Sequence, residues 1–433
     1  MRRQKTIRIR PTQRCILWLF NLGVFASTFN FFFKENMPIP IANEILNVID
    51  ELSVILILLI TLTRGHINRN GTFLTFMILF TTVGLIGNII HRSSWTVAAL
   101  GLFNTMKPLI LFWCLCQYKF NWHHFYSVMK YYLYFFPFVF ISYVFDIFLP
   151  GFRSYIGIQA QVDDFRMGLR CLGGLFSRYT YAVIYGMVYY LYFSFYTHQK
   201  KKVWLRIFSA FMIFGGLRVK DILSFCIGNT FIFFKRIKTT SLLIIFALGA
   251  AMFSLYTILM PEHYALYFES GDDSNVARVV LGYTSLNIAK DNIPFGVGFG
   301  MFASPISRQY KSRVYSDYGI DSVYGLDFER DGGMYMCDSF WPMLIGETGI
   351  LGTLLYISIL YVGFRPFIKR FLKDTQDPYA IFPTFLFIVF LITSIGKPVF
   401  TGPPHALILW GFAGIFYSLE EPKHKSEVHT NYI

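Results

Sequence analysis

Asp338 and Ser339 end a long hydrophilic segment, and an apolar stretch of the chain begins directly after them. A stretch of that length can form a membrane-spanning helix, so a carboxylate and a hydroxyl group stand where water meets hydrocarbon. A carboxylate at such a boundary can take the proton of an attacking hydroxyl group, which is general-base catalysis. Asp-Ser is also a common helix N-cap, because its side chains accept hydrogen bonds from the first helical N–H groups. The sequence leaves both interpretations open.

Cationic side chains gather on the same side of the predicted membrane protein. Arg218 and Lys220 lie in a short turn between two apolar stretches, and Arg170 and Arg278 lie in two long loops. Short external loops are usually poor in Lys and Arg, so this turn runs against the usual charge bias. Guanidinium groups bind phosphate through paired hydrogen bonds, so these residues predict an anion site. The alternative is that they pair with nearby acids or contact lipid headgroups.

The segment that precedes Asp338 also contains tyrosines, among them Tyr335. Their rings could stack on sugar faces, or they could anchor the loop at the membrane interface. No metal site is expected, because histidine clusters and Asp-x-Asp pairs are lacking, and the adjacent Asp272 and Asp273 are the one feature weighed against this. The six cysteines have no metal-ligand spacing. A disulfide between Cys171 and Cys337 remains open if their compartment is oxidising.

The composition predicts the class of protein. Of 433 residues, 55% are hydrophobic and only 15% are charged, against roughly 25% charged in soluble domains. Apolar runs of about 20 residues recur, and each can cross a bilayer. We therefore expect an all-α integral membrane protein with about twelve transmembrane helices and two long external loops that contain short helices. The net charge of +14 is not attributed to nucleic-acid binding, because no soluble domain presents a basic surface.

The hydropathy pattern divides the chain into spans and loops. The predicted spans are 15–33, 45–63, 72–91, 95–116, 126–148, 179–197, 203–217, 221–234, 240–260, 339–363, 379–396 and 405–419. The seventh and eighth are short and could form a re-entrant hairpin instead. The resulting segments are a basic N-terminus (1–14), spans one to five (15–148), an external loop (149–178), spans six to nine (179–260), a large external loop (261–337), spans ten to twelve (338–419) and a tail (420–433).

Charge predicts the orientation of these spans. Residues 1–14 contain six Lys or Arg and no acid, which is typical of a cytoplasmic segment, whereas 261–337 contains ten acids and six Lys or Arg. Both termini are therefore expected in the cytoplasm of a bacterium, with the protein in the inner membrane. Asp50 and Glu51 in the second span could pair with Lys107 in the fourth. Such a pair would serve packing or, alternatively, transport.

Three stretches together resemble the bacterial O-antigen polymerase and ligase family. They are Arg170-Cys-Leu-Gly-Gly-Leu-Phe176, Pro294-Phe-Gly-Val-Gly-Phe-Gly-Met-Phe302 and Asp338-Ser, nine residues, Gly349, two residues, Gly352. They are similar to the family's Arg-x-x-Gly-x-Phe segment, its glycine-rich loop and its His-Ser-type signature. The first stretch has an extra glycine, and Asp338 stands where the ligases carry histidine.

The resemblance implies a glycosyltransferase that uses undecaprenyl-diphosphate-linked oligosaccharides at the external face of the membrane, with neither cofactor nor metal. Asp338 would then act as base, and Arg218 would stabilise the negative charge of the leaving diphosphate. The expected substrate-binding residues are Arg170, Lys220, Arg278, Ser339 and Tyr335. The aspartate in place of histidine favours a polysaccharide polymerase over an O-antigen ligase. A lipid-linked oligosaccharide flippase is the alternative from another class. Membrane lipids and a chain-length regulator protein are the other candidate partners.

Overall fold

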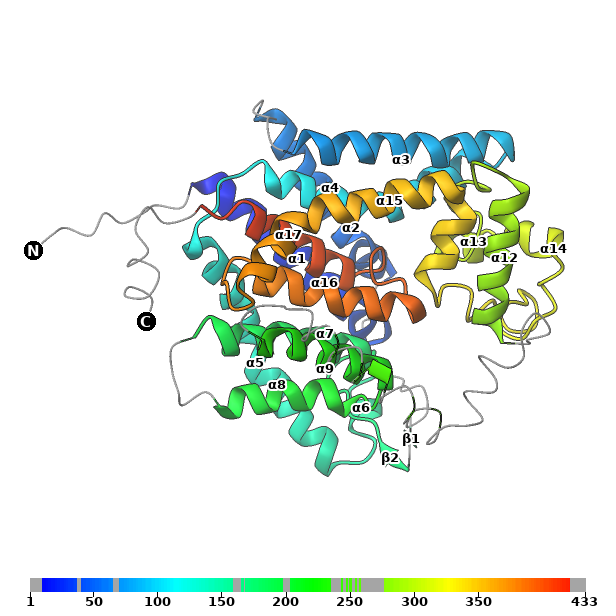
Figure 1. Cartoon of the computed structure of the whole chain (residues 1–433). Helices are drawn as coiled ribbons and strands as arrows, with labels where there is room; N and C mark the ends of the chain where they lie inside the picture. Colours follow the sequence, from blue (N-terminus) through cyan, green and yellow to red (C-terminus); the bar gives the residue numbers. More distant parts are fainter. Residues whose placement is uncertain are drawn as a thin grey trace, which may run out of the picture.

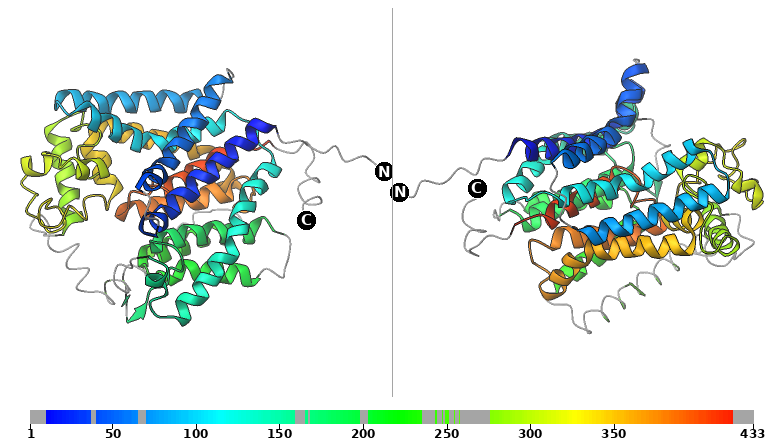
Figure 2. Two further views of the ribbon diagram at one scale, coloured as in Figure 1. Left: turned by 180° about the vertical axis from the view of Figure 1, so that it is seen from behind. Right: turned by 90° about the horizontal axis from the view of Figure 1, so that it is seen from above.

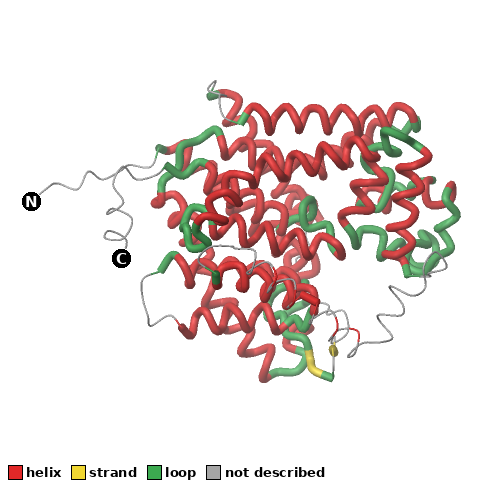
Figure 3. Tube along the Cα trace, in the orientation of Figure 1, coloured by secondary structure: helices red, strands yellow, loops and turns green. Residues whose placement is uncertain are grey.

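The computed structural model describes residues 10–36, 40–64, 70–158, 165–166, 168–197, 203–234 and 276–420, together with isolated positions between 243 and 257. These residues are mostly helical (Figure 3). The long helices are α1 (Pro11–Asn36), α2 (Pro40–Thr63), α3 (Gly71–Ile90), α4 (Trp95–Cys116), α5 (Trp122–Phe148), α7 (Tyr179–Phe195), α8 (Val203–Gly215), α9 (Val219–Phe233), α12 (Ala277–Asp291), α15 (Phe340–Lys373), α16 (Ile381–Thr393) and α17 (His405–Tyr417). The short elements are α6 (Phe152–Tyr155), α13 (Pro305–Gln309), α14 (Val314–Asp317), the 3-10 turn η4 (Ser394–Gly396), and the strands β1 (Phe165–Arg166) and β2 (Leu169–Arg170).

The long helices form a bundle with two distinct ends. The start of α1 and the end of α17 lie at one end, whereas α12, α13 and α14 lie at the other (Figures 1 and 2). Phe120, between α4 and α5, pairs with Leu419 through a single β-bridge at the first end. The only sheet among the described residues is the β1–β2 hairpin, in which Phe165 pairs with Arg170. Sequence analysis did not predict this hairpin.

Four helices of the described chain are long and apolar enough to cross a membrane, namely α3, α4, α5 and α15. Helices α8 and α17, and α16 continued by η4, are apolar but shorter. This composition is that of an all-α membrane-embedded protein. Helices coincide with each predicted span except 240–260, most of which lies outside the described residues. The number of crossings and their direction stay predictions.

Aromatic side chains hold the bundle together. The sequence contains 49 Phe and 28 Tyr, and many of their rings meet edge to face inside the bundle, an arrangement that aromatic quadrupoles favour. Phe125 of α5, fully buried, contacts Phe382 of α16 and Phe416 of α17, with ring centroids 5.9 and 5.1 Å apart. Phe364 of α15 stacks on Phe387 of α16 at 4.1 Å. Helices far apart in the sequence are thereby fixed against one another.

The glycine-rich stretch 294–302 threads between α3 and α15. Gly349 interrupts α15 with a φ of 66°, and a Cβ atom there would lie 2.4 Å from the carbonyl carbon of Phe295. On the N-terminal side of this break, the Gly346 carbonyl accepts a hydrogen bond from the Val297 N–H at 3.0 Å. A positive φ and such a close backbone approach are what only glycine allows without strain. The element that approaches Gly349 so closely is this loop and not a neighbouring helix.

The stretch is also fastened to α3. The Asn88 side chain accepts the Phe299 N–H and donates to the Phe299 carbonyl, each at 2.9 Å. The Phe299 ring lies against Gly84, where a Cβ atom would come within 2.2 Å of it. The loop after α12 is thus anchored inside the bundle. Helices α13 and α14 come directly after this anchored stretch in the chain.

Candidate functional site

Asp338 lies just before the N-terminus of α15 and pairs with the first turn of α12. Arg278 Nη2 donates to Asp338 Oδ2 at 2.6 Å, and the two side chains are 40% and 32% exposed. An ion pair that water can still reach contributes little to stability. It does orient the carboxylate and keep both groups accessible to a solute. The structure therefore brings together two residues that the sequence singled out separately.

The helix-cap interpretation of the Asp-Ser pair does not describe the Asp338 carboxylate. The N-cap position of α15 is occupied by Ser339, whose buried side chain makes no capping hydrogen bond. The Asp338 carboxylate instead faces Arg278. Its place at the helix start is thus not accounted for by capping.

Asp338 borders a cavity of about 640 Å³. Its wall is built from the start of α7, the helix α13, the loop 328–338 and the loop 397–405. The charged lining residues are Arg178, Arg308, Lys311, Lys397 and Asp338. Four basic side chains therefore face one carboxylate among the described lining residues. A cavity of this size holds a ligand of several hundred daltons, and its charge favours an anion.

Three of these basic residues have no carboxylate within ion-pairing distance in the described parts of the chain, namely Arg178, Arg308 and Lys397, whereas Lys311 pairs with Glu329. Arg178 precedes α7 and stands over the Tyr181 ring, 6.0 Å from its centroid. Burial lowers the pKa of Lys397 far below its ordinary value, and the positive charges of Arg218, Lys220 and Arg178 lower it further. Asp221 opposes this shift.

Arg218 and Lys220 lie at the start of α9, close enough to Lys397 for their charges to affect its pKa. Arg218 occupies the N-cap position, and Lys220 donates to the carbonyl of Gly396 in η4 at 2.7 Å. The sequence placed Lys220 in the turn, whereas in the structure it belongs to the first turn of the helix. This contact ties α9 to the loop that carries Lys397. Both predicted cations thus belong to the cluster around the cavity, although neither is among its lining residues.

Arg170 and Tyr335 are not among the residues that line the cavity. The guanidinium group of Arg170 is held by the fully buried Asp146 of α5, to which it donates at both the carboxylate and the main-chain carbonyl. Asp146 also accepts the N–H groups of Gly173 and Gly174, at 2.9 Å each. Arg170 is therefore part of a structural network. Neither it nor Tyr335, which packs over Gly325, lines the cavity.

Cys171 and Cys337 are not joined by a disulfide, and Cys337 lines the cavity. Burial raises the pKa of Cys337 to about 12. Glu347 is buried and accepts the Phe302 N–H at 3.3 Å, which is a packing role. The expected pair inside the bundle is confirmed, because Lys107 lies 2.6 Å from Asp50.

Sequence reasoning did not select Arg178, Lys397 or His405 as site residues. All three line the cavity, and their signal was available, since each lies at the outer end of a predicted span. The sequence does not reveal which basic residue forms an ion pair with an acid. Arg170 forms one with Asp146, which belongs to helix α5. No protein-family model matches the chain, and no curated protein matches it either.

Proposed function

We propose that the protein is a membrane glycosyltransferase that elongates a bacterial polysaccharide. Its donor is an undecaprenyl-diphosphate-linked oligosaccharide, and its acceptor is a second lipid-linked repeat unit. The observation that carries the proposal is the cavity of about 640 Å³, in which four basic side chains and the Asp338 carboxylate meet beside α15. The resemblance of the segment 338–352 to the polymerase and ligase signature supports the same reaction.

The cationic side of the cavity suits the leaving group of this reaction. As the glycosidic bond to the diphosphate breaks, its electron pair stays with the diphosphate oxygen, and negative charge grows there. Fixed cations stabilise such charge most effectively where water is largely excluded. Arg178 and Lys397 would contact the diphosphate directly. Arg218 and Lys220 would add positive charge close to these two residues.

The Asp338 carboxylate suits the other half of the reaction. An acceptor hydroxyl group loses its proton as its oxygen attacks the anomeric carbon, and a carboxylate within hydrogen-bonding reach can take that proton. Arg278 holds Asp338 in one orientation at the rim of the cavity. Asp338 would then be the base, and Arg278 a residue that positions it.

The test is polymer length in cells whose only copy of the gene carries Asp338→Asn. A general base contributes about 10²- to 10⁴-fold to rate, so long chains should disappear at normal protein abundance. Asp317→Asn is the matched control, because Asp317 is an exposed acid of the same loop, 58% exposed, outside the cavity lining. Long chains in the Asp338→Asn cells, at wild-type abundance, would refute the assignment of the base.

The cation site is tested with Lys397→Met and Arg218→Ala, each at verified abundance. Loss of one charge stabiliser of this kind typically costs about 10²- to 10³-fold in rate. Arg313→Ala is the control, since Arg313 is an exposed loop cation that does not line the cavity. Single repeat units should still reach the outer face of the inner membrane in all these variants. If single units remain inside the cell, a flippase is the better description.

The ligase alternative differs only in its acceptor. It predicts that the same substitutions leave polymer attached to the carrier lipid while none reaches lipid A-core. The expected location is the bacterial inner membrane, with both termini in the cytoplasm and the site outside. A chain-length regulator protein remains a candidate partner on this proposal.

A further inference from the structure

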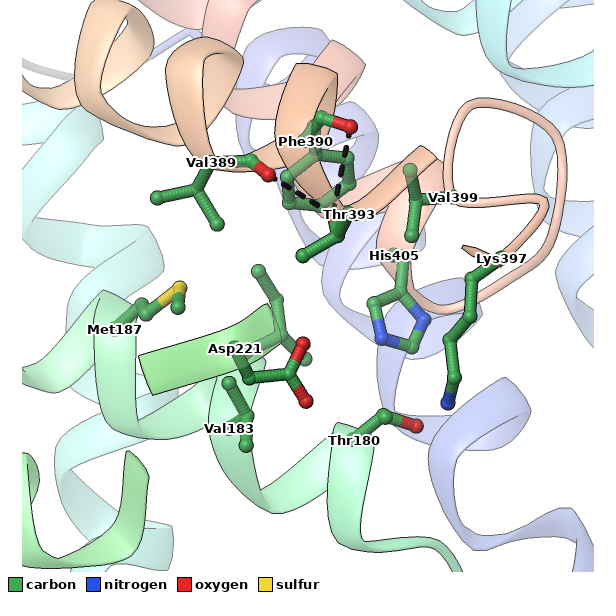
Figure 4. Close-up of a pocket in the computed structure, with 11 residues that line it drawn as sticks. Thr180, Val183, Met187, Asp221, Val389, Phe390, Thr393, Lys397, Val399 and His405 are labelled. Atoms are coloured by element: carbon green, nitrogen blue, oxygen red, sulfur yellow. Dashed lines mark hydrogen bonds between the residues drawn. The ribbon is translucent and has the colours of Figure 1, made fainter. Parts of the chain in front are cut away.

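A second, much smaller cavity adjoins the larger one. Its volume is about 20 Å³, and it lies between α7, α9, α16 and the loop before α17 (Figure 4). Thr180, Lys397, Val399 and His405 line both cavities, so the two share a wall. A space of this size holds one water molecule, which needs about 10–15 Å³, and it is too small for an organic ligand.

Two polar atoms in the wall of the small cavity have no hydrogen-bond partner among the residues that the structure describes, Asp221 Oδ2 and Thr180 Oγ1. Each residue is only 3% exposed. Leaving such groups unsatisfied is costly, and native proteins usually satisfy them with protein atoms or with buried water. Figure 4 shows the Asp221 carboxylate directed toward His405 across this space, with Lys397 beyond.

The position of Asp221 in the first turn of α9 favours a negative charge there. That preference does not account for an unsatisfied oxygen in a cavity wall that includes a threonine hydroxyl. A metal cation is a poor occupant, because the charges of Arg218, Lys220 and Lys397 lie close by. Water can donate to Asp221 and still exchange hydrogen bonds with Thr180 and the Lys397 amine.

We propose that one ordered water molecule occupies the small cavity and links Asp221 to Thr180 and Lys397, so that Asp221 is a positioning residue for the anion site. Through this water, Asp221 keeps the Lys397 ammonium in the shared wall, facing the larger cavity. The charged groups around Lys397 are Arg178 before α7, Arg218, Lys220 and Asp221 at the start of α9, and His405 at the start of α17. Asp221 is the acid among them, and Arg308 and Asp338 are further charged residues in the wall of the larger cavity that Lys397 also lines. This role rests on the proposed function, since it presumes that the larger cavity binds an anion.

The water itself is tested by a high-resolution map of the full chain in lipid nanodiscs. Density for a single water within hydrogen-bonding distance of Asp221 Oδ2 and Thr180 Oγ1 is the expected result. A cavity without density, or density at the distances typical of a metal ligand, overturns the assignment. Thr180→Val should abolish the density, because it removes one partner at nearly constant volume.

The positioning role is tested by the affinity of the same nanodisc protein for inorganic pyrophosphate, measured calorimetrically over the whole pH range in which the protein stays folded. Affinity should fall as pH rises through the pKa of Lys397, because the amine loses its charge. Asp221→Asn removes the negative charge that opposes the lowering of the Lys397 pKa, so this fall should move to lower pH by about one unit, a tenfold change at fixed pH. Thr180→Val should move it in the same direction, and Lys397→Met should remove it.

Thr384→Val is the matched control for Thr180→Val. The Thr384 hydroxyl is also buried without a partner, but Thr384 lines neither cavity. Pyrophosphate itself changes its ionisation with pH. That change is the same for the wild-type protein and every variant, so it cancels when their profiles are compared. If wild-type protein and Asp221→Asn give the same profile, the positioning role is wrong while the proposed function stands. If wild-type protein does not bind pyrophosphate at any pH, the anion site of the proposed function fails first.

Discussion

The ion pair between Lys107 of α4 and Asp50 of α2 permits a quantitative test of what holds the bundle together. The Lys107 ammonium lies 2.6 Å from Asp50 Oδ2, and the two side chains are 3% and 8% exposed. Breaking such a buried pair costs about 3–5 kcal/mol, because one charge is left without compensation. Glu51 lies 3.6 Å from the same ammonium and is 40% exposed. It therefore supplies part of the missing charge when Asp50 is removed.

From this geometry we expect Asp50→Asn to lower the free energy of unfolding by about 3 kcal/mol, the lower end of that range. Asp50→Asn combined with Glu51→Gln should approach about 5 kcal/mol, since no acid then faces Lys107. Asp50→Leu with Lys107→Met should be close to neutral, because apolar residues of similar volume often replace a buried pair without loss. The measurement is reversible unfolding in mixed micelles.

The charge-free variant also separates a packing role from a transport role. If Asp50→Leu with Lys107→Met is as unstable as Asp50→Asn alone, the argument from charge compensation is refuted. If it is stable and its cells still make long polymer, the pair serves packing. If it is stable but single repeat units no longer leave the cytoplasm, the ionisable groups themselves are needed. The flippase alternative would then be favoured.

Three further substitutions test other parts of the structure. Gly349→Ala should destabilise the protein by about 1–3 kcal/mol or more, because φ is 66° and the new Cβ would meet the Phe295 backbone; an unchanged unfolding midpoint would contradict the helix break. Arg170→Ala should lower the amount of folded protein through the loss of its pair with Asp146, while activity per folded molecule stays within about twofold; a selective loss of activity would restore Arg170 to the site. Cys337 should react slowly with iodoacetamide at pH 8 in the folded protein, since a pKa of about 12 leaves only about 1 thiol in 10⁴ ionised; labelling as fast as in denaturant would contradict its burial.

The helices and the central site residues could be predicted from the sequence because both depend on local pattern. An apolar run of fixed length predicts a span, and a charged residue at its end is expensive enough to be informative. Asp338, Arg278, Arg218 and Lys220 were selected in this way, and the structure gathers all four near one cavity. Their meeting follows from the bundle, since their elements begin or end on the same side.

What the sequence could not give is the pairing between elements. Arg170 and Arg178 are eight positions apart with similar surroundings, yet Arg170 is held by Asp146 of α5 and Arg178 lines the cavity. Nothing in the local pattern distinguishes them. The break at Gly349 was missed for a related reason. A glycine in an apolar run can serve either close packing or a backbone turn, and the choice depends on the loop that approaches it.

The cation cluster itself is an argument for function. Lys397 comes from the loop before α17, Arg178 precedes α7, and Arg218 and Lys220 begin α9, so folding brings like charges together from three elements. Such convergence costs free energy, which the packed helices around it must offset. Proteins usually break a local rule of this kind where function requires it. Binding of an anion would relieve this repulsion. The attraction would be strongest for the state of the anion that carries the most negative charge. A diphosphate leaving group reaches that state as the glycosidic bond breaks, so the same cluster would favour the transition state over the bound donor.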